Sequence, residues 1–284
     1  MDFFVFLYHS KKNFFGKSMT LLLFSFVLYA LVGTTAGIAG GMLGIGGGTI
    51  TVPALFIIFS MIGLPQAYLM HLSIGTSLAS MVINTFSATK AHHAKGSVKW
   101  DTVKRMLPGV VMGSLLGGLT AHYLSGIILE IIFGLFALAL GLHYLRPLKP
   151  HGDEGKLPGF PLIDLCSGFI AWISNILGIG GGVLTVPYLN AYRVPEKKAI
   201  GTSVAVSFFI SLLGALFYLF FGLSDVGFGI AFGYIYVPAF IILSCSSYVA
   251  APYGVKLAHY LPSKTLRKCF AFTMMIVGLL MIFG

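Results

Sequence analysis

The sequence predicts an all-α integral membrane protein built from two homologous halves, and three observations support this fold class. Apolar residues make up 57% of the 284 residues and charged residues only 9%, whereas soluble domains carry about 25% charged residues. The basic residues fall in short clusters between long apolar runs. A glycine-rich stretch occurs twice, at corresponding places in the chain. Too little charge is available to cover a soluble surface, so lipid is the expected solvent for most of the molecule.

The internal repeat divides the chain. Residues 43–55 read LGIGGGTITVPAL and residues 177–189 read LGIGGGVLTVPYL, with ten of thirteen positions identical. The order continues, because Ile-Gly-Thr-Ser occurs at 74–77 and 200–203, and Ala-His-Tyr-Leu at 121–124 and 258–261. We therefore expect an N-terminal segment (1–18), a first membrane repeat (19–146), a polar linker (147–159) and a second membrane repeat (160–284).

Each half offers five apolar segments that can be compared with the membrane thickness. A helix needs about 20 residues to cross the hydrocarbon. The expected segments are 19–41, 43–62, 66–90, 102–121 and 124–145 in the first half, and 161–177, 179–192, 197–221, 230–250 and 264–283 in the second. The second segment of each set is rich in glycine and contains a proline. We predict that it is a broken or re-entrant helix. The first segment follows Lys11, Lys12 and Lys17 but shows no cleavage pattern, so we interpret it as a membrane segment and not as a signal peptide.

Counting lysine and arginine predicts the orientation, because these residues concentrate in cytoplasmic loops. If all five segments of each half cross, with the N-terminus outside, the cytoplasmic loops hold 15 of the 18 basic residues. These loops are 90–105, 146–156, 193–198 and 254–268. The rival arrangement, with a non-crossing hairpin as the second segment, places 11 basic residues inside and 7 outside. Five crossings per half is an odd number, so we expect inverted repeats; the three N-terminal lysines are the exceptions.

The remaining composition excludes several classes of protein. The net charge of +10 does not indicate nucleic-acid binding, because the basic clusters lie in the positions expected of cytoplasmic loops. Cys166, Cys245 and Cys269 form no CxxC pair and all lie in apolar segments, so neither a disulfide framework nor a thiol relay is predicted. Neither a cofactor nor a metal site is expected.

The two glycine elements, 44–48 and 178–182, are not nucleotide-binding loops. Neither continues into Gly-Lys-Ser/Thr, and a dinucleotide fingerprint requires a βαβ unit that these apolar surroundings do not supply. Repeated glycines disfavour a regular helix. Irregular backbone in a membrane survives only against protein or a water-filled cavity. A short helix starting after each element would aim its N–H groups and positive dipole end into that cavity, which suits an anion.

Two interpretations of the glycines stay open. Matching interrupted segments in two halves indicate the midplane site of a transporter. The alternative is close helix packing, since small residues let helix backbones approach in lipid. The repetition in both halves, followed by a hydroxyl and a proline, favours a substrate-lining role.

The glycine element followed by Thr-Val-Pro in both halves, the Ile-Gly-Thr-Ser segments and the stretch from Gly117 to Ala121-His122 resemble the sulfite exporter TauE/SafE family, also called domain of unknown function 81. The resemblance covers nearly the whole chain outside residues 1–18 and the linker. It implies a bacterial inner-membrane protein that exports or takes up sulfite, sulfoacetate or related organosulfur anions, driven by an ion gradient. The motif does not discriminate between these substrates.

The candidate substrate-binding residues follow from the repeated elements, and Asn175 is added because it directly precedes the second one. They are Gly46, Gly47, Gly48, Thr49, Thr51, Gly180, Gly181, Gly182, Thr185, Thr76, Ser77, Thr202, Ser203 and Asn175. Hydroxyls within a helix often bond their own backbone instead. Asn84 and Ser207 are further polar groups in apolar runs. Glu130 is the candidate for proton coupling, unless it lies at the membrane interface.

The leading functional hypothesis is an alternating-access transporter of a small anion, sulfite or an organosulfonate such as sulfoacetate, and not an enzyme. An anion channel of the same architecture is the nearest alternative. A membrane-embedded enzyme would need a nucleophile with its base or a metal cluster, and no such pattern stands out. A purely structural module would leave the duplicated broken helices unexplained. The expected partners are the anion, membrane lipid and protons for coupling, with the oligomeric state open, a dimer included.

Overall fold

The computed structural model describes residues 2–145, 155, 157–225, 230–260 and 263–283; for residues 2–22, 259, 263–269 and 283 it describes the backbone alone. The first half contains α1 (Asp2–Leu43), α2 (Gly48–Met61), the 3-10 helix η1 (Gln66–Tyr68), α3 (Leu69–Ala94), α4 (Trp100–Tyr123) and α5 (Gly126–Leu145). The second half contains α6 (Leu162–Leu177), α7 (Gly182–Ala191), α8 (Glu196–Gly222), β1 (Ala231–Phe232), β2 (Ile235–Tyr236), α9 (Val237–Tyr260) and α10 (Ser263–Phe283).

The all-α fold class is confirmed, and each predicted segment corresponds to one helix. The prediction was wrong for residues 231–236, where a helix was expected to begin. An antiparallel two-stranded hairpin lies there, with Ala231 paired to Tyr236 and Phe232 to Ile235. Gly233, in the turn, has φ +59°, a left-handed conformation that glycine adopts without a steric penalty.

Three described α-helices are shorter than the roughly 20 residues that a simple crossing needs: α6, with 16 residues, falls slightly short, and α2 and α7 are much shorter. The α2 helix has 14 residues and α7 has 10, which at about 1.5 Å per residue gives roughly 21 and 15 Å against a hydrocarbon core of about 30 Å. Five described helical stretches are long and apolar enough to cross: Leu23–Leu43, Gln66–Ala94, Gly126–Leu145, Glu196–Gly222 and Val237–Ala258. Their length, together with the many exposed leucine, isoleucine and phenylalanine side chains on the outside, defines a multi-pass membrane protein.

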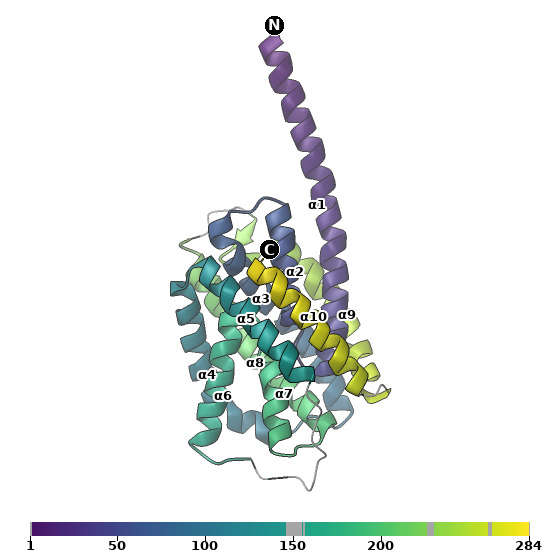
Figure 1. Cartoon of the computed structure of the whole chain (residues 1–284), viewed down its shortest axis with the longest axis vertical. Coiled ribbons are helices and arrows are strands. Elements are labelled where there is room, and N and C mark those ends of the chain that lie inside the picture. Colours follow the sequence, from purple (N-terminus) through teal and green to yellow (C-terminus); the bar gives the residue numbers. More distant parts are fainter. Residues whose placement is uncertain (1, 146–154, 156, 226–229, 261–262, 284) are drawn as a thin grey trace.

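Helices of one half pack against helices of the other. The α3 helix lies antiparallel to α8, since Gly75 is beside Tyr218 and Phe86 is beside Phe208. The α5 and α10 helices are also antiparallel, because Gly134 contacts Ile282 and Gly141 contacts Met275. Figure 1 shows this last pair crossing in front of the helical body. In these two pairs, helices at matching places in the two halves therefore run in opposite directions.

The other two main pairs are parallel and close. Gly33 and Gly37 of α1 face Ser246 and Ser247 of α9. In the same way, Gly109, Gly113 and Gly117 of α4 face Asp164, Gly168 and Trp172 of α6. A Cβ at any of these α4 glycines would lie within 3 Å of an α6 atom, so small residues permit the close approach, as is common between membrane helices.

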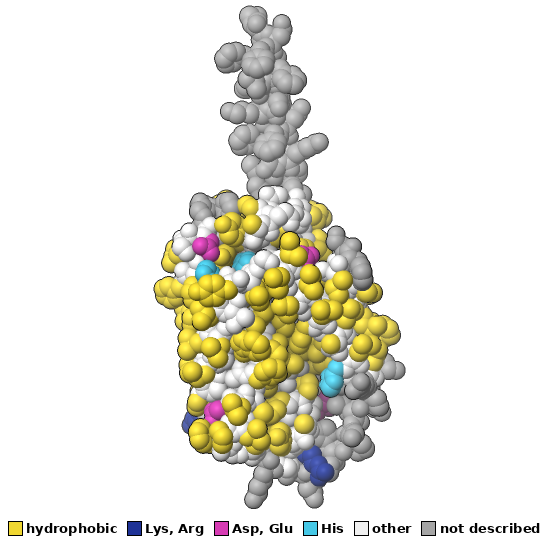
Figure 2. Space-filling model, turned by 60° about the vertical axis from the view of Figure 1, so that its left-hand side comes forward, with side chains coloured by type: hydrophobic (Ala, Val, Ile, Leu, Met, Phe, Trp, Pro, Cys, Tyr) yellow, Lys and Arg dark blue, Asp and Glu magenta, His cyan; other side chains and the backbone are white. Residues whose placement is uncertain are grey.

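Described residues of two predicted cytoplasmic loops, 90–105 and 146–156, lie against the ends of α7 and α8 that flank a third, 193–198. The backbone N–H of Lys99 donates to Thr202 Oγ1 at the start of α8, and the N–H of Gly155 donates to the carbonyl of Tyr192. Figure 2 shows lysine or arginine side chains near the lower end of the face in view, and histidine and acidic side chains towards both ends. The orientation of these ends in a membrane remains a prediction.

Candidate substrate site

The two glycine elements cross each other in the interior. Both are fully buried, and a Cβ added to Gly48 would overlap the carbonyl oxygen of Gly178, as one added to Gly182 would overlap that of Gly44. Three glycines in each element have positive φ, at matching positions: Gly44, Gly46 and Gly47, and Gly178, Gly180 and Gly181. Left-handed backbone of this kind excludes a continuous helix, so α1 ends and α2 starts anew, as do α6 and α7.

The serine of each Ile-Gly-Thr-Ser segment forms a hydrogen bond to the glycine element of the opposite half. Ser77 Oγ on α3 donates to the Gly178 carbonyl at 3.1 Å. Ser203 Oγ on α8 lies 3.1 Å from the Gly44 carbonyl and 3.1 Å from that of Gly182. Gly44 and Gly178 directly follow α1 and α6, so these contacts supply donors to carbonyl groups at helix ends, where intrahelical donors are missing.

The threonines of the same segments bind backbone at the start of another helix. Thr76 Oγ1 accepts from the Tyr236 N–H at 2.9 Å, directly before α9. Thr202 Oγ1 accepts from the Lys99 N–H at 3.0 Å, directly before α4. The four Ile-Gly-Thr-Ser hydroxyls thus lie at contacts between halves, in matching pairs.

The threonines after the glycines bond their own helices. Thr51 Oγ1 donates to the Gly47 carbonyl at 3.1 Å and Thr185 Oγ1 donates to the Gly181 carbonyl at 2.9 Å. Their hydroxyl hydrogens are therefore engaged in this conformation. Gly47 and Gly181 are the N-cap residues of α2 and α7 and, as glycines, offer no side-chain acceptor to the first N–H groups of these helices.

Met81 occupies the space between the two elements. This side chain, on α3 and only 1% exposed, places its terminal methyl where a Cβ on either Gly46 or Gly180 would overlap it. Its sulfur lies 3.9 Å from Ser77 Oγ. The flexible thioether adapts to irregular gaps, so Met81 closes the predicted site in this conformation.

The structure brings Asn84 to the crossing, a residue that the candidate set leaves out. Its Nδ2 donates to the Gly46 carbonyl at 2.9 Å. Asn175, which was included, donates to the Ala171 carbonyl at 3.0 Å and packs between Gly117 and Gly214. Sequence reasoning identified both as polar groups in apolar runs, but proximity in sequence to the glycines favoured Asn175.

Several buried polar atoms near the crossing have no hydrogen-bond partner within the described part of the chain. They are Thr49 Oγ1, Asn84 Oδ1 and Ser207 Oγ. Their side chains are 1%, 3% and 0% exposed. Because an unpaired buried polar group costs about 1–3 kcal/mol, a functional reason for each is expected, such as a ligand or water bound there.

Glu130 is not part of this crossing. It lies partly exposed in the second turn of α5, a helix that packs mainly along α10. Its assignment as a coupling residue remains a prediction.

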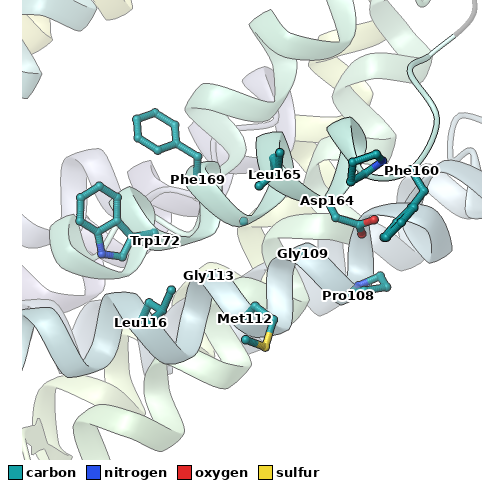
Figure 3. Close-up of a pocket in the computed structure, with 12 residues that line it drawn as sticks. Pro108, Gly109, Met112, Gly113, Leu116, Phe160, Asp164, Leu165, Phe169 and Trp172 are labelled. Atoms are coloured by element: carbon teal, nitrogen blue, oxygen red, sulfur yellow. The ribbon is translucent and has the colours of Figure 1, made fainter.

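A separate apolar groove runs between α4 and α6 (Figure 3). Its volume is about 660 Å³, and its lining includes Met112, Leu116, Phe169 and Trp172, with Asp164 near one end. Met112 and Phe169 are more than half exposed on the outer surface of the helical body, where lipid is expected. Apart from Asp164, the lining supplies no charged group, so the groove does not resemble a site for a small anion.

A buried crossing of two broken helices inside a multi-pass bundle is typical of membrane transporters. The sequence profile of the family described as "Sulfite exporter TauE/SafE" matches residues 29–281. The chain belongs to this family.

Curated relatives carry names of the same class. A probable membrane transporter protein of Haemophilus influenzae is 30% identical over 260 residues, covering 90% of this chain and 98% of the relative. One of Methanocaldococcus jannaschii is 28% identical, covering 90% of this chain and 94% of the relative. YunE of Bacillus subtilis, also named a probable membrane transporter protein, is 26% identical, covering 70% and 80%. These names indicate a transporter and not an enzyme. No solved structure matches the chain.

Proposed function

We propose that this membrane transporter moves a small sulfur-containing anion, sulfite or an organosulfonate such as sulfoacetate, by alternating access. The family description supports the substrate class. The observation that carries the proposal is the paired chain break at the crossing, where α2 and α7 begin at uncapped glycines. Two helix N-termini supply N–H donors and partial positive charge without the desolvation cost of a buried lysine.

The site we propose lies between Gly46–Thr51 and Gly180–Thr185. The unpartnered oxygens of Thr49 and Ser207 support it, since both are hydroxyls that can donate to an anion. Met81 lies between the elements and must move for an anion to bind there. A site that a side chain closes favours a transporter over a channel, because a channel needs a continuous path for the anion through the protein in its open state.

We further propose that the two halves cross the membrane in opposite orientations. The antiparallel packing of α3 on α8 and of α5 on α10, together with the charge distribution of the loops, supports this arrangement. Rocking of one half against the other about the crossing would then alternate the access.

The test is flux in liposomes that contain the purified full-length protein. Radiolabelled sulfite, sulfoacetate, sulfate, thiosulfate and acetate are compared in counterflow exchange, with and without a proton gradient. We expect exchange of sulfite or sulfoacetate that saturates with concentration. Absence of exchange for every anion would contradict the proposed function, and flux that does not saturate and is independent of substrate inside the liposomes would instead identify a channel.

A further inference from the structure

A cluster of titratable side chains lies where α4 and α8 end and α3 begins. It contains His71 of α3, His122 of α4, Asp225 directly after α8, and Tyr234 of the hairpin turn. None of these residues belongs to the glycine crossing. Histidine is the side chain whose charge changes most readily between pH 5 and 8, so a buried histidine in such a cluster requires an explanation.

His71 has one ring nitrogen engaged and one without a partner. Its Nε2 lies 3.2 Å from the Ala121 carbonyl, and since a carbonyl only accepts, Nε2 carries the hydrogen. In the neutral ring Nδ1 is then an acceptor. This atom is buried and has no hydrogen-bond partner among the described residues, while the side chain is only 5% exposed. A proton is the smallest ligand that fits this position.

His122 and Asp225 connect the cluster to water. The His122 Nδ1 lies 3.9 Å from Asp225 Oδ2, and the two side chains are 25% and 31% exposed. The hydrogen bond from Tyr234 lowers the pKa of Asp225, and the Ser224 hydroxyl, His122 and His71 act in the same direction, while partial burial opposes them. Asp225 is therefore ionised at neutral pH and places a negative charge at the exposed side of the cluster.

Among the described residues, the other titratable groups that face the cluster are tyrosines. Tyr234 stacks on His71 with ring centroids 5.0 Å apart, Tyr68 and Tyr218 lie against Tyr234 at 6.3 and 6.1 Å, and Tyr123 lies beside His122 at 5.2 Å. An aromatic face stabilises a cation. The Tyr234 ring therefore offsets part of the desolvation cost that burial imposes on an imidazolium at His71, and these tyrosines supply no permanent positive charge that would repel the proton.

The cluster is joined to the substrate crossing through α3 and the hairpin. The Tyr234 carbonyl packs on Gly75, the Tyr236 N–H donates to Thr76, and Ser77 donates to the Gly178 carbonyl. Tyr218, which contacts Tyr234, also donates to the Asn175 carbonyl at 3.3 Å. A change of charge at His71 therefore affects the contacts between α3 and the hairpin, and these contacts connect to the second glycine element, 178–182.

We propose that His71 binds the proton that drives transport, with Asp225 and His122 forming its access route from the aqueous phase. A proton from water binds at Asp225 or His122 and passes to His71 Nδ1, which becomes an imidazolium; it leaves from the same nitrogen when the protein changes conformation. This inference rests on the proposed transport function and assigns the coupling role to His71 in place of Glu130.

The test separates exchange from coupling in liposomes that contain the full-length protein. In His71→Gln the amide retains a donor for the Ala121 carbonyl but does not titrate. We expect counterflow exchange of radiolabelled sulfite close to wild type and a loss of about tenfold in transport driven by a proton gradient, within the usual range of coupling between two sites. His93→Gln, an exposed histidine beside Trp100 at the other end of α3, is the matched control and should change neither assay.

His122→Gln is the second variant, because it lies at a partly exposed position and should tolerate replacement if His71→Gln does not fold. It should slow gradient-driven transport and leave exchange intact. Full gradient-driven transport in both variants, with an unchanged pH profile, would overturn the proposal. If the wild type exchanges no anion at all, the transport function itself fails, and the inference fails with it.

Discussion

Hydrogen bonds of the same kind hold the glycine elements of the first and second halves of the chain in place. Ser77 and Ser203 each donate to a carbonyl of the other half's element, and Thr76 and Thr202 each accept from the backbone N–H directly before a helix of the other half. Both glycine elements also share their positions of positive φ. The parts that both halves retain are therefore those that shape the broken backbone.

The halves differ in the side chains that face the crossing. Matching the Ile-Gly-Thr-Ser segments places Met81 opposite Ser207 and Asn84 opposite Ile210, and matching the glycine elements places Thr49 opposite Val183. The first half thus contributes the occluding thioether and the amide bound to Gly46. We infer that the hydrogen bonds common to both halves hold the broken backbone in place. The side chains that differ between the halves determine which anion the site binds and when the site opens.

The largest difference is expected between Gly47→Ala and Gly181→Ala. Both glycines have positive φ, but a Cβ at Gly47 would lie 2.7 Å from the Ala36 carbonyl oxygen, whereas one at Gly181 would overlap only the end of the Ile210 side chain, which can move. We expect a loss in the free energy of unfolding of about 3 kcal/mol for Gly47→Ala and about 1–2 kcal/mol for Gly181→Ala. Transport should fall in both variants, and more in the first. Thermal melting in detergent and liposome exchange measure these effects.

Exchanging Met81 and Ser207 tests the asymmetry at the centre. Met81→Ser removes the side chain between Gly46 and Gly180 and should increase substrate leak down its gradient, at a stability cost of about 2–5 kcal/mol for the cavity. Ser207→Met should overfill the same space and slow exchange. The control is Met106→Ser, which empties an equally buried position on α4. Equal leak in Met81→Ser and Met106→Ser would show that Met81 does not close the site.

Asn84→Ile gives the first half the residue that the second half has at the matching position, Ile210. The Gly46 carbonyl then loses its donor, which costs about 1–3 kcal/mol, and we expect the apparent affinity for the anion to fall by roughly tenfold, as the upper part of this range allows. Asn190→Ile, near the end of α7, serves as the comparison. Unchanged substrate affinity in Asn84→Ile would remove this amide from the site.

The smallest effects are expected for Thr51→Val and Thr185→Val. Each hydroxyl donates to the carbonyl four residues earlier in its own chain, and a single bond of this kind contributes about 1 kcal/mol. Transport should weaken by about fivefold or less, and to the same extent in both variants. If all four glycine and threonine variants express normally and transport at the wild-type rate, the glycines are packing residues and the substrate site lies elsewhere.

Much of the fold can be predicted from the sequence, because the lipid bilayer constrains the length of membrane helices and the pattern of apolar residues along them. Most of the ten helices begin and end close to the predicted segments, and the glycine runs correctly indicate where chain breaks occur. The exceptions are α1, which begins at Asp2 and not at residue 19, and α9, which runs from Val237 to Tyr260 and not over 230–250. The hairpin at 231–236 was not predicted, since Ile, Tyr and Phe in a short apolar run suit a strand and a helix equally well. Its position depends on Tyr236 meeting Thr76, 160 residues earlier, a contact that no local pattern reveals.

The site was predictable in its backbone but not in its side chains. Repetition identified Gly46 to Gly48 and Gly180 to Gly182, yet the same repetition gave no weight to Met81 and Asn84, which have no counterpart in the other half. Asn175 was favoured by its closeness to the glycines in sequence, but a helix directs its side chain towards Gly117 and Gly214. Which face of α3 meets the crossing depends on tertiary packing.

Single-cysteine labelling tests the inverted arrangement of the two halves most directly. In a chain whose Cys166, Cys245 and Cys269 are replaced by serine, Gln66→Cys, Lys95→Cys and Lys197→Cys are exposed in turn to an impermeant thiol reagent outside intact cells. All three native positions are exposed in the structure. We predict labelling of Gln66→Cys and protection of both lysine positions until the cells are opened. Labelling of Lys197→Cys but not of Lys95→Cys from outside would contradict the inverted arrangement and indicate four crossings per half.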